Sequence, residues 1–260
     1  MKPIYYHEPD EYLAQWILNL INAGHLPYGQ IDTRDIREIR PSEINCFSQC
    51  HFFAGIGIWA LSLERVGWPY HTPIWTASFS REHDRAASGS IETDVTDWAA
   101  FCWLANQCRP RVAIGDKITA YAGLAWIDDL SGNMASNDYA FWTTNICASS
   151  IGSPHIDQRL LFMATDRQHN PAFIRIWQDR QGKPASNFNA SERGREHPWS
   201  NAKWTGQQHG KRFAVDPAAS TVVESNTRRV EQIRAYGSSI VAPLATEFAF
   251  AVRQYLEKST

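Results

Sequence analysis

Apolar residues near the N-terminus recur at the spacing of a helix. One face of that helix is formed by Leu13, Trp16, Ile17, Leu20 and Ile21, which follow positions i, i+3, i+4, i+7 and i+8. A glycine at position 24 then ends the pattern. The polar residues 32–44 predict only a short helix or turn, so residues 1–45 are expected to be a helical lead-in.

Short apolar segments alternate with longer amphipathic ones from residue 50 onward. Strands are predicted at residues 50–54, 74–77, 111–115, 139–146 and 159–164, and helices at 58–66, 98–107, 122–130 and 242–256. Because strands that alternate with helices form a parallel sheet covered on both faces, this order predicts an α/β fold with a mostly parallel sheet.

The periodicity ends after Thr165. Residues 166–226 are rich in Gln, Asn, Ser, Gly and Pro, which predicts a small loop-rich insert. We therefore expect a main domain at 46–165, the insert at 166–226, and a C-terminal segment at 227–260 that completes the main domain.

Composition narrows the class of protein. With 260 residues, 43% of them hydrophobic, the chain can bury a full core. No apolar run approaches the roughly 18 residues of a membrane span, and the N-terminus lacks the apolar region of a signal peptide. Five cysteines are an odd number without framework spacing, as expected in a reducing compartment. We expect a cytoplasmic protein without a membrane partner.

The net charge of −2 conceals an uneven distribution. Residues 166–230 contain 11 Lys and Arg against 6 Asp and Glu, whereas the remainder contains 14 against 21. Phosphate attraction depends on the face presented to a duplex, so this local excess favours contact with nucleic acid. The alternative is a solvated loop whose aromatic residues pack on the main domain.

A glycine-containing turn follows the first predicted strand of the main domain. The sequence Phe53-Ala54-Gly55-Ile56-Gly57 leads from that strand into a helix. The glycines permit a tight turn and close approach of a ligand, and the helix N-terminus supplies free amide donors. Without the third glycine of the dinucleotide fingerprint, the motif alone also fits a simple turn.

The longer string from His51 to Ser80 resembles the start of a DNA cytosine-5 methyltransferase of the short phage and prophage type. A second string, residues 232–243, resembles the last motif of that family. The resemblance implies a Rossmann-like class I methyltransferase fold with S-adenosylmethionine as cofactor and double-stranded DNA as partner. It also implies a cofactor site formed by Phe53, Ala54, Gly55, Ile56, Gly57, Ser238 and Ser239, with the Phe53 ring against the adenine.

Two features of the implied cofactor site depart from expectation. Ser238 stands where the family usually has Asn, and a hydroxyl replaces only part of the hydrogen bonding of an amide. We also find no acidic residue after a second strand that is placed to bind the ribose hydroxyls.

The reactive residues of the family are altered in this chain. Methylation at C5 needs a thiolate nucleophile, but Ser78 is followed directly by Phe79 where the family has a Pro-Cys-Gln segment between Ser and Phe. The family Glu corresponds to Asp116, and of two family arginines only Arg159 remains, because the first is Asp157. Ser78, Asp116 and Arg159 are therefore weak catalytic candidates, and no His or Lys adjacent to Ser78 is evident to activate its hydroxyl.

Neither another cysteine nor a metal replaces the missing nucleophile in the sequence. Each remaining cysteine has the pattern of an ordinary buried residue. Cys46, Cys50 and His51 lack a matching second pair of ligands, so we predict no metal.

The basic insert lies where the family has its target-recognition region. Basic and aromatic residues are interspersed there, as in surfaces that contact phosphates and stack on bases. The DNA-binding candidates are Arg193, Arg195, Lys203, Lys211, Arg212, Trp199 and Trp204.

Three functional hypotheses follow. The leading one is a phage or prophage methyltransferase homologue without methyltransferase activity, which binds DNA and S-adenosylmethionine and occupies sites, shields phage DNA from host defence, or partners an active enzyme. The second is an active, diverged transferase that acts on a DNA base or nucleotide. The third is a protein-interaction module with a protein partner.

Overall fold

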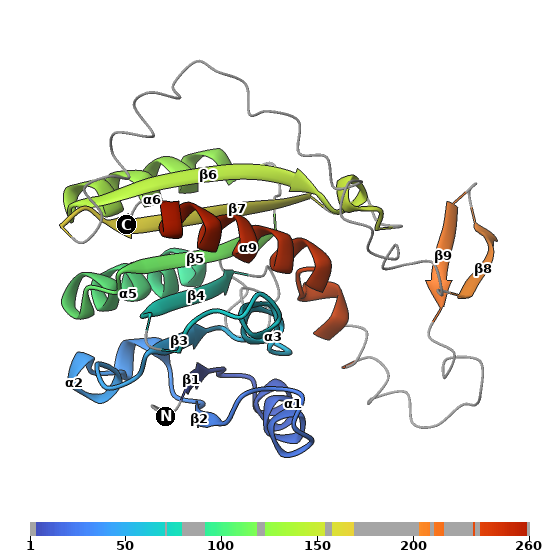
Figure 1. Ribbon diagram of the computed structural model, residues 1–260, viewed down its shortest axis with the longest axis horizontal. Helices are drawn as coiled ribbons and strands as arrows, with labels where there is room; N and C mark the ends of the chain where they lie inside the picture. The colour runs from blue at the N-terminus through green and yellow to red at the C-terminus, as the bar shows by residue number, and fades with distance from the viewer. Residues whose placement is uncertain are drawn as a thin grey trace.

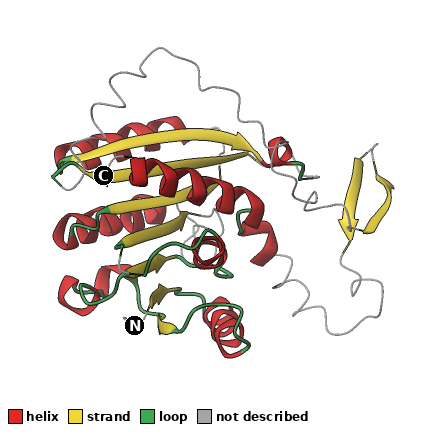
Figure 2. Cartoon of the chain, in the orientation of Figure 1, coloured by secondary structure: helices red, strands yellow, loops and turns green. Residues whose placement is uncertain are grey.

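The computed structural model describes residues 4–70, 72–79, 92–118, 123–153, 158–168, 203–208, 211–215, 231 and 235–258. Most of these residues build one seven-stranded sheet with helices on both faces (Figures 1 and 2). Its order is β2-β1-β3-β4-β5-β7-β6, with bounds β1 Ile4–His7, β2 Gly29–Asp32, β3 Gln49–Phe52, β4 Ile74–Phe79, β5 Val112–Ile118, β6 Tyr139–Cys147 and β7 Gln158–Asp166.

Strand direction gives the sheet its class. The pairs β1–β2, β1–β3, β3–β4 and β4–β5 are parallel, and β7 runs antiparallel to both β5 and β6. The chain crosses between parallel strands through helices, as parallel pairing requires. The predicted Rossmann-like α/β fold with a mostly parallel sheet is confirmed.

The helices pack on the sheet in the order that the apolar pattern predicts. Their bounds are α1 Glu11–Asn22, α2 Pro41–Ile44, α3 Ile58–Arg65, α5 Glu92–Cys108, α6 Gly123–Ser136 and α9 Ala242–Lys258, with short 3-10 turns η1 Ile36–Glu38 and η2 Ala148–Ile151. The predicted helices at 58–66, 98–107, 122–130 and 242–256 correspond to α3, α5, α6 and α9. In α1, the side chain of Asp10 accepts from the backbone N–H groups of Tyr12 and Leu13 and caps the helix.

Two hydrophobic cores lie on opposite faces of the sheet. Successive strand residues point to opposite faces: on β7, Phe162 joins one core, whereas Leu161 and Met163 join the other. The first core lies under α2, α5 and α6, and the second lies under α3 and α9. A smaller cluster packs α1 against β1 through Ile17, Ile4 and neighbouring residues.

The first 45 residues differ from the predicted helical lead-in. Besides α1 they contain β1 and β2, which form one edge of the main sheet. Both strands are only four residues long, too short for their alternation to be recognised in the sequence. The N-terminal segment is therefore part of the main sheet.

The insert also contains regular structure where a loop was predicted. Strands β8 Lys203–Gln208 and β9 Lys211–Val215 pair antiparallel in a separate two-stranded sheet (Figure 1). Neither strand has the alternating pattern of a half-buried strand, which is why the sequence did not reveal them.

The C-terminal stretch Ala235–Glu257 is the one helical segment among the described residues that is long and apolar enough to cross a membrane, by length and composition. Its residues Leu244, Phe248 and Val252 are buried in the core with α3 and the sheet. That apolar face is thus occupied by the protein's own core.

Candidate functional site

The glycine turn, residues 53–57, links β3 to α3 through left-handed backbone. Phe53, Gly55 and Gly57 have φ of 50°, 58° and 81°, and Gly57 is the residue before the first turn of α3. Glycine adopts such angles without the steric cost of a side chain. A Cβ on Gly57 would lie 2.5 Å from Cδ1 of Leu26, whereas a Cβ on Gly55 would make one ordinary contact, with Oγ of Ser239 at 3.8 Å.

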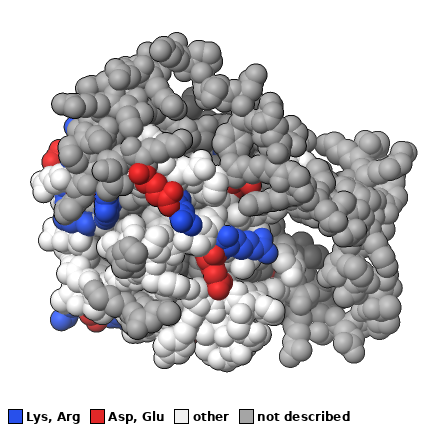
Figure 3. Space-filling model, in the orientation of Figure 1, with Lys and Arg blue, Asp and Glu red and all other residues white. Residues whose placement is uncertain are grey.

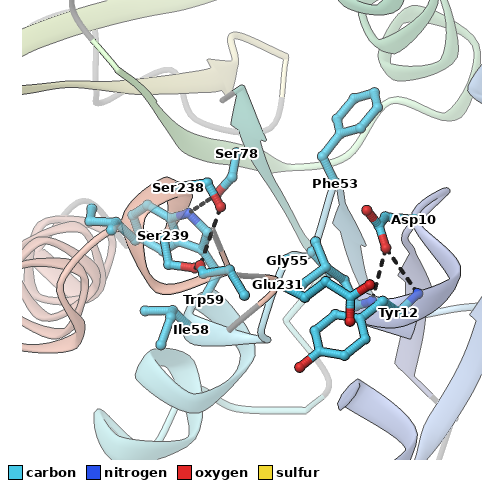
Figure 4. Close-up of a pocket in the computed structure, with 14 residues that line it drawn as sticks. Asp10, Tyr12, Phe53, Gly55, Ile58, Trp59, Ser78, Glu231, Ser238 and Ser239 are labelled. Atoms are coloured by element: carbon cyan, nitrogen blue, oxygen red, sulfur yellow. Dashed lines mark hydrogen bonds between the residues drawn. The ribbon is translucent and has the colours of Figure 1, made fainter. Parts of the chain in front are cut away.

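A pocket opens beside this turn (Figure 4). Its empty volume, which includes open solvent in front of the pocket, is about 750 Å³. The walls come from α1, the glycine turn, α3, β4 and the C-terminal segment. The lining residues are Asp10, Tyr12, Leu13, Phe53, Ala54, Gly55, Ile58, Trp59, Ser78, Glu231, Ala235, Ser238, Ser239 and Ile240.

The predicted cofactor residues are partly brought together. Phe53, Ala54, Gly55, Ser238 and Ser239 line the pocket, whereas Ile56 packs in a cluster with Leu13 and Ala235. The two strings at opposite ends of the sequence therefore meet at one site.

The ring of Phe53 packs against two aromatic side chains of the protein. Its ring makes an edge contact with His7, with centroids 5.0 Å apart, and a tilted contact with Phe79 at 5.4 Å. Only 4% of the residue is exposed. Phe53 is thus a fixed, mostly buried part of the pocket lining.

Glu8 is the acidic residue that the sequence did not reveal. It directly follows β1, and β1 pairs with β3, the strand that carries the glycine turn. In a Rossmann-like sheet, an acidic residue about 20 residues beyond the glycine turn binds the ribose hydroxyls. Here the strand next to β3 is β1, which precedes the glycine turn in the sequence. An acidic residue was expected after the turn, and for this reason Glu8 was not predicted.

The Glu8 carboxylate is part of the glycine turn. It is fully buried, and its Oε2 accepts from the N–H of Gly55 at 2.6 Å, while Oε1 accepts from the N–H of Asp10 at 3.0 Å. The sequence contains a pattern that could have identified Glu8. A short, mostly apolar segment, Ile4–His7, is followed by this acidic residue just before an amphipathic helix.

The carboxylate after β2 has a different environment. Asp32 accepts from the hydroxyl of Tyr5 at 2.8 Å and forms an ion pair of 2.7 Å with Arg34. Burial raises the pKa of Asp32, but the hydrogen bonds from Arg34 and Tyr5 outweigh burial and lower it to about 2. Asp32 is thereby committed to its own partners.

The C-terminal wall, Ser238–Ser239, closes the opposite side of the pocket. Both hydroxyls donate to the backbone carbonyl of Ala235, at 3.2 Å and 2.7 Å. The hydroxyl hydrogens are therefore used within the wall.

The three weak catalytic candidates lie together in one network behind the pocket, the reaction-side network of Trp59, Ser78, Asp116 and Arg159. Ser78 donates to Oδ1 of Asp116 at 2.7 Å, and Nε1 of Trp59 donates to the same oxygen at 2.9 Å and to Oγ of Ser78 at 3.1 Å. Nη1 of Arg159 donates to the other carboxylate oxygen at 3.0 Å. Both oxygens of Asp116 are thus occupied.

Asp116 and Arg159 form a buried ion pair. Their side chains are 0% and 1% exposed. Burial raises the pKa of Asp116, and the charge of Arg159 with the hydrogen bonds from Ser78 and Trp59 opposes that rise. The hydroxyl of Ser78 thus donates to a carboxylate that is also paired with a guanidinium.

None of the five cysteines is among the residues that line the pocket. Cys50 and Cys102 are buried as expected, whereas Cys46 is exposed and Cys108 and Cys147 are only partly buried, which corrects the expectation for those three. Burial raises the pKa of the Cys50 and Cys102 thiols, and it raises the pKa of Cys108 to about 11. Thiols with raised pKa values are protonated at neutral pH and unreactive. Within the described part of the chain, no group of three or more His, Cys, Asp or Glu is placed to hold a metal.

The DNA-binding candidates are only partly located. Arg193, Arg195 and Trp199 lie outside the described residues, whereas Lys203 and Trp204 lie on β8 and the remaining two candidates, Lys211 and Arg212, lie on β9. Figure 3 shows acidic and basic side chains interspersed on the described part of one face. On that part, the visible charges form no uniform basic patch.

No protein-family model matches the sequence, and none of the curated proteins matches it. Similar solved structures include a DNA modification methyltransferase encoded within a prophage of E. coli, 12% identical over 63% of this chain and 40% of that chain, with a TM-score of 0.41. The Dnmt2 methyltransferase of S. pombe is 8% identical over 63% of this chain and 49% of its own, with a TM-score of 0.38.

A mutant DNMT2 of Spodoptera frugiperda is also similar, at 8% identity over 64% of this chain and 50% of its own, with a TM-score of 0.37. The chain spans half or less of the length of these three proteins. At these identities and scores the matches add no functional information, and the Rossmann-like fold follows from the strand order itself.

Proposed function

We propose that this chain is a DNA cytosine-5 methyltransferase homologue that binds S-adenosylmethionine in the pocket and does not transfer its methyl group. The main support for this proposal is a contrast between two parts of the site. The glycine turn lines an open pocket, whereas both carboxylate oxygens of Asp116 in the reaction-side network accept from the protein's own side chains. The bound cofactor would supply an electrophilic methyl group, and the chain presents no activated nucleophile to receive it.

The residues of the pocket fit this cofactor. Gly55 leaves room where a side chain would otherwise stand, and Glu8 lies at the end of the neighbouring strand, the position that binds ribose hydroxyls in Rossmann-like folds. Asp10 lines the same pocket and adds a further acceptor. We assign the ribose to Asp10, with Glu8 holding the adjacent glycine turn through the N–H of Gly55, and the methionine end to the glycine turn and the C-terminal wall.

Calorimetric titration with S-adenosylmethionine tests this assignment. We expect saturable heat with one ligand per chain. Absence of heat at millimolar cofactor contradicts it.

We further propose that the basic insert binds double-stranded DNA. Support comes from residues 166–230, which are the insert and the first four residues after it and contain 11 Lys and Arg against 6 Asp and Glu, because counterion release from phosphates drives such binding. The biological role would then be to occupy DNA sites, to shield phage DNA from host defence, or to partner an active enzyme. Duplex binding should weaken as salt rises, and a salt-independent affinity contradicts the proposal.

One observation favours the alternative of an active, diverged transferase. The hydroxyl of Ser78 lies 2.7 Å from a carboxylate oxygen of Asp116 and lines the pocket. In that case labelled methyl groups would enter DNA or a nucleotide, and Ser78→Ala would abolish the transfer. Incorporation at stoichiometric or higher levels would replace the proposal of an inactive homologue.

A further inference from the structure

Arg159 holds the main chain of the pocket wall. Its Nη1 donates to the carbonyl of Ser238 at 3.1 Å, and its Nη2 donates to the carbonyl of Ser239 at 2.9 Å. These carbonyls lie at the end of the helical turn that contains residues 235–238, where an arginine can satisfy carbonyls that lack a partner within the helix. The guanidinium thus joins β7 to a segment about 80 residues further along the chain.

The same guanidinium is fixed from its other side by Asp116. A buried arginine is tolerated when its charge is paired and its N–H groups are hydrogen-bonded. Asp116 supplies the charge, and the two wall carbonyls supply acceptors. The planar fork of arginine donates in several directions at once, which the single ammonium of lysine does with poorer geometry.

The pair is also connected to the other walls of the pocket. Trp59 on α3 and Ser78 on β4 both donate to Asp116, and both line the pocket. Trp59, Ser78, Ser238 and Ser239 all line the pocket, and Figure 4 shows them in the same part of the view. One buried ion pair therefore connects three separate elements of the lining.

We propose that Arg159 is a positioning residue, which with Asp116 fixes the Ser238–Ser239 wall and thereby sets the affinity of the pocket without touching the ligand. This inference rests on the proposed binding of S-adenosylmethionine. It assigns to two weak catalytic candidates a role in shaping the pocket. A wall released from Arg159 would have to be ordered by the ligand, and that ordering costs affinity.

The test compares Arg159→Gln and Arg159→Lys with Arg253→Gln. Arg253 is a matched control, because it also donates to two backbone carbonyls, those of Val66 and Gly67, but lies away from the lining residues. We would measure the Kd for S-adenosylmethionine by calorimetry, amide hydrogen exchange at residues 235–241, and the melting temperature of each variant.

Arg159→Gln should raise the Kd at least about fivefold and speed amide exchange at residues 235–241, at temperatures where the remaining amides stay protected. Arg159→Lys should recover part of the affinity. Arg253→Gln should lower the melting temperature and leave the Kd unchanged. If Arg159→Gln does not fold, the test rests on Arg159→Lys. Amide exchange at residues 235–241 of that variant should be faster than in the wild type and slower than in an unfolded chain.

An unchanged Kd and unchanged exchange in a folded Arg159 variant would overturn the inference. An equal loss of affinity in Arg253→Gln would also overturn it, because it would show a general effect of stability. If the wild-type protein binds no cofactor, the proposed function fails, and the exchange of the wall still decides the role of Arg159.

Discussion

The two sides of the pocket use buried carboxylates in opposite ways. Glu8 accepts from the backbone N–H groups of two pocket-lining residues, Gly55 and Asp10, whereas Asp116 accepts from three side chains within the core. The first arrangement shapes a main-chain turn that a ligand can approach. In the second arrangement, both oxygens of the carboxylate already accept hydrogen bonds from the protein's own side chains. This difference is the basis for proposing ligand binding at the pocket without methyl transfer at the network.

The largest expected effect is on the closed side. Asp116→Ala removes the carboxylate that forms a buried ion pair with Arg159, so the free energy of unfolding should fall by about 3–5 kcal/mol. Urea denaturation measures this loss. Glu257→Ala is the control, because it removes the exposed ion-pair partner of Arg253. It should lower the free energy of unfolding by less than about 1 kcal/mol. Similar losses in both variants would show that Asp116 carries no special structural role.

On the open side, Glu8→Gln should act on binding. The amide keeps the shape but loses the charge that accepts from the N–H of Gly55 and holds the glycine turn, so the affinity for S-adenosylmethionine should fall roughly 10- to 100-fold. Calorimetry measures the change. Glu11→Gln, at an exposed position in the first turn of α1, is the control with the same change of charge. Equal affinity in Glu8→Gln and wild type would remove Glu8 from the cofactor site.

A histidine beneath the pocket gives the sheet a pH dependence. His51 on β3 is buried, bonds through Nδ1 to Oγ1 of Thr76 at 2.7 Å, and burial lowers its pKa to about 3. Below pH 6.5 the unfolded chain takes up a proton that the folded chain does not accept until about pH 3. Stability is therefore lost as pH falls through this window, by up to about 1.4 kcal/mol per pH unit.

His51→Asn should flatten that slope. The comparison is the unfolding free energy of wild type, His51→Asn and the exposed-site control His25→Asn between pH 7 and 4. An identical slope in wild type and His51→Asn would show that His51 does not cause the acid sensitivity.

The smallest effect separates backbone strain from crowding at the glycine turn. Gly57→Ala and Gly24→Ala both place a side chain at positive φ, 81° and 74°, but only the first meets another residue, Leu26. Both variants should lose stability through strain, and Gly57→Ala should lose about 1 kcal/mol more. Thermal unfolding of the two variants measures the difference. Equal losses would mean that Leu26 moves aside freely.

The sequence predicted the features that local patterns encode. Amphipathic spacing gave α1 and α9, and the glycine turn was recognised because Gly55 and Gly57 follow an apolar strand directly. It did not reveal β1 and β2, since four-residue strands carry too little alternation. Glu8 was missed for a related reason: its neighbour in space, the glycine turn, lies 47 positions away in the unexpected direction along the chain.

The network on the reaction side was predicted only in part. Family resemblance selected Ser78, Asp116 and Arg159, and the structure brings these three together. Trp59 was not expected to join them. A tryptophan at helical spacing is predicted to be a core residue, and the apolar pattern does not show where its indole N–H donates. The hold of Arg159 on Ser238 and Ser239 depends on long-range packing that a single sequence does not encode.

The central claim is that the pocket binds the cofactor and the network does not use it. The most direct test incubates the protein with methyl-labelled S-adenosylmethionine and duplex DNA, and follows the label on the protein and in the DNA. We predict about one exchangeable, unreacted cofactor per chain and no label in DNA. Label incorporated into DNA at stoichiometric or higher levels, or no label retained by the protein at millimolar cofactor, would contradict the account.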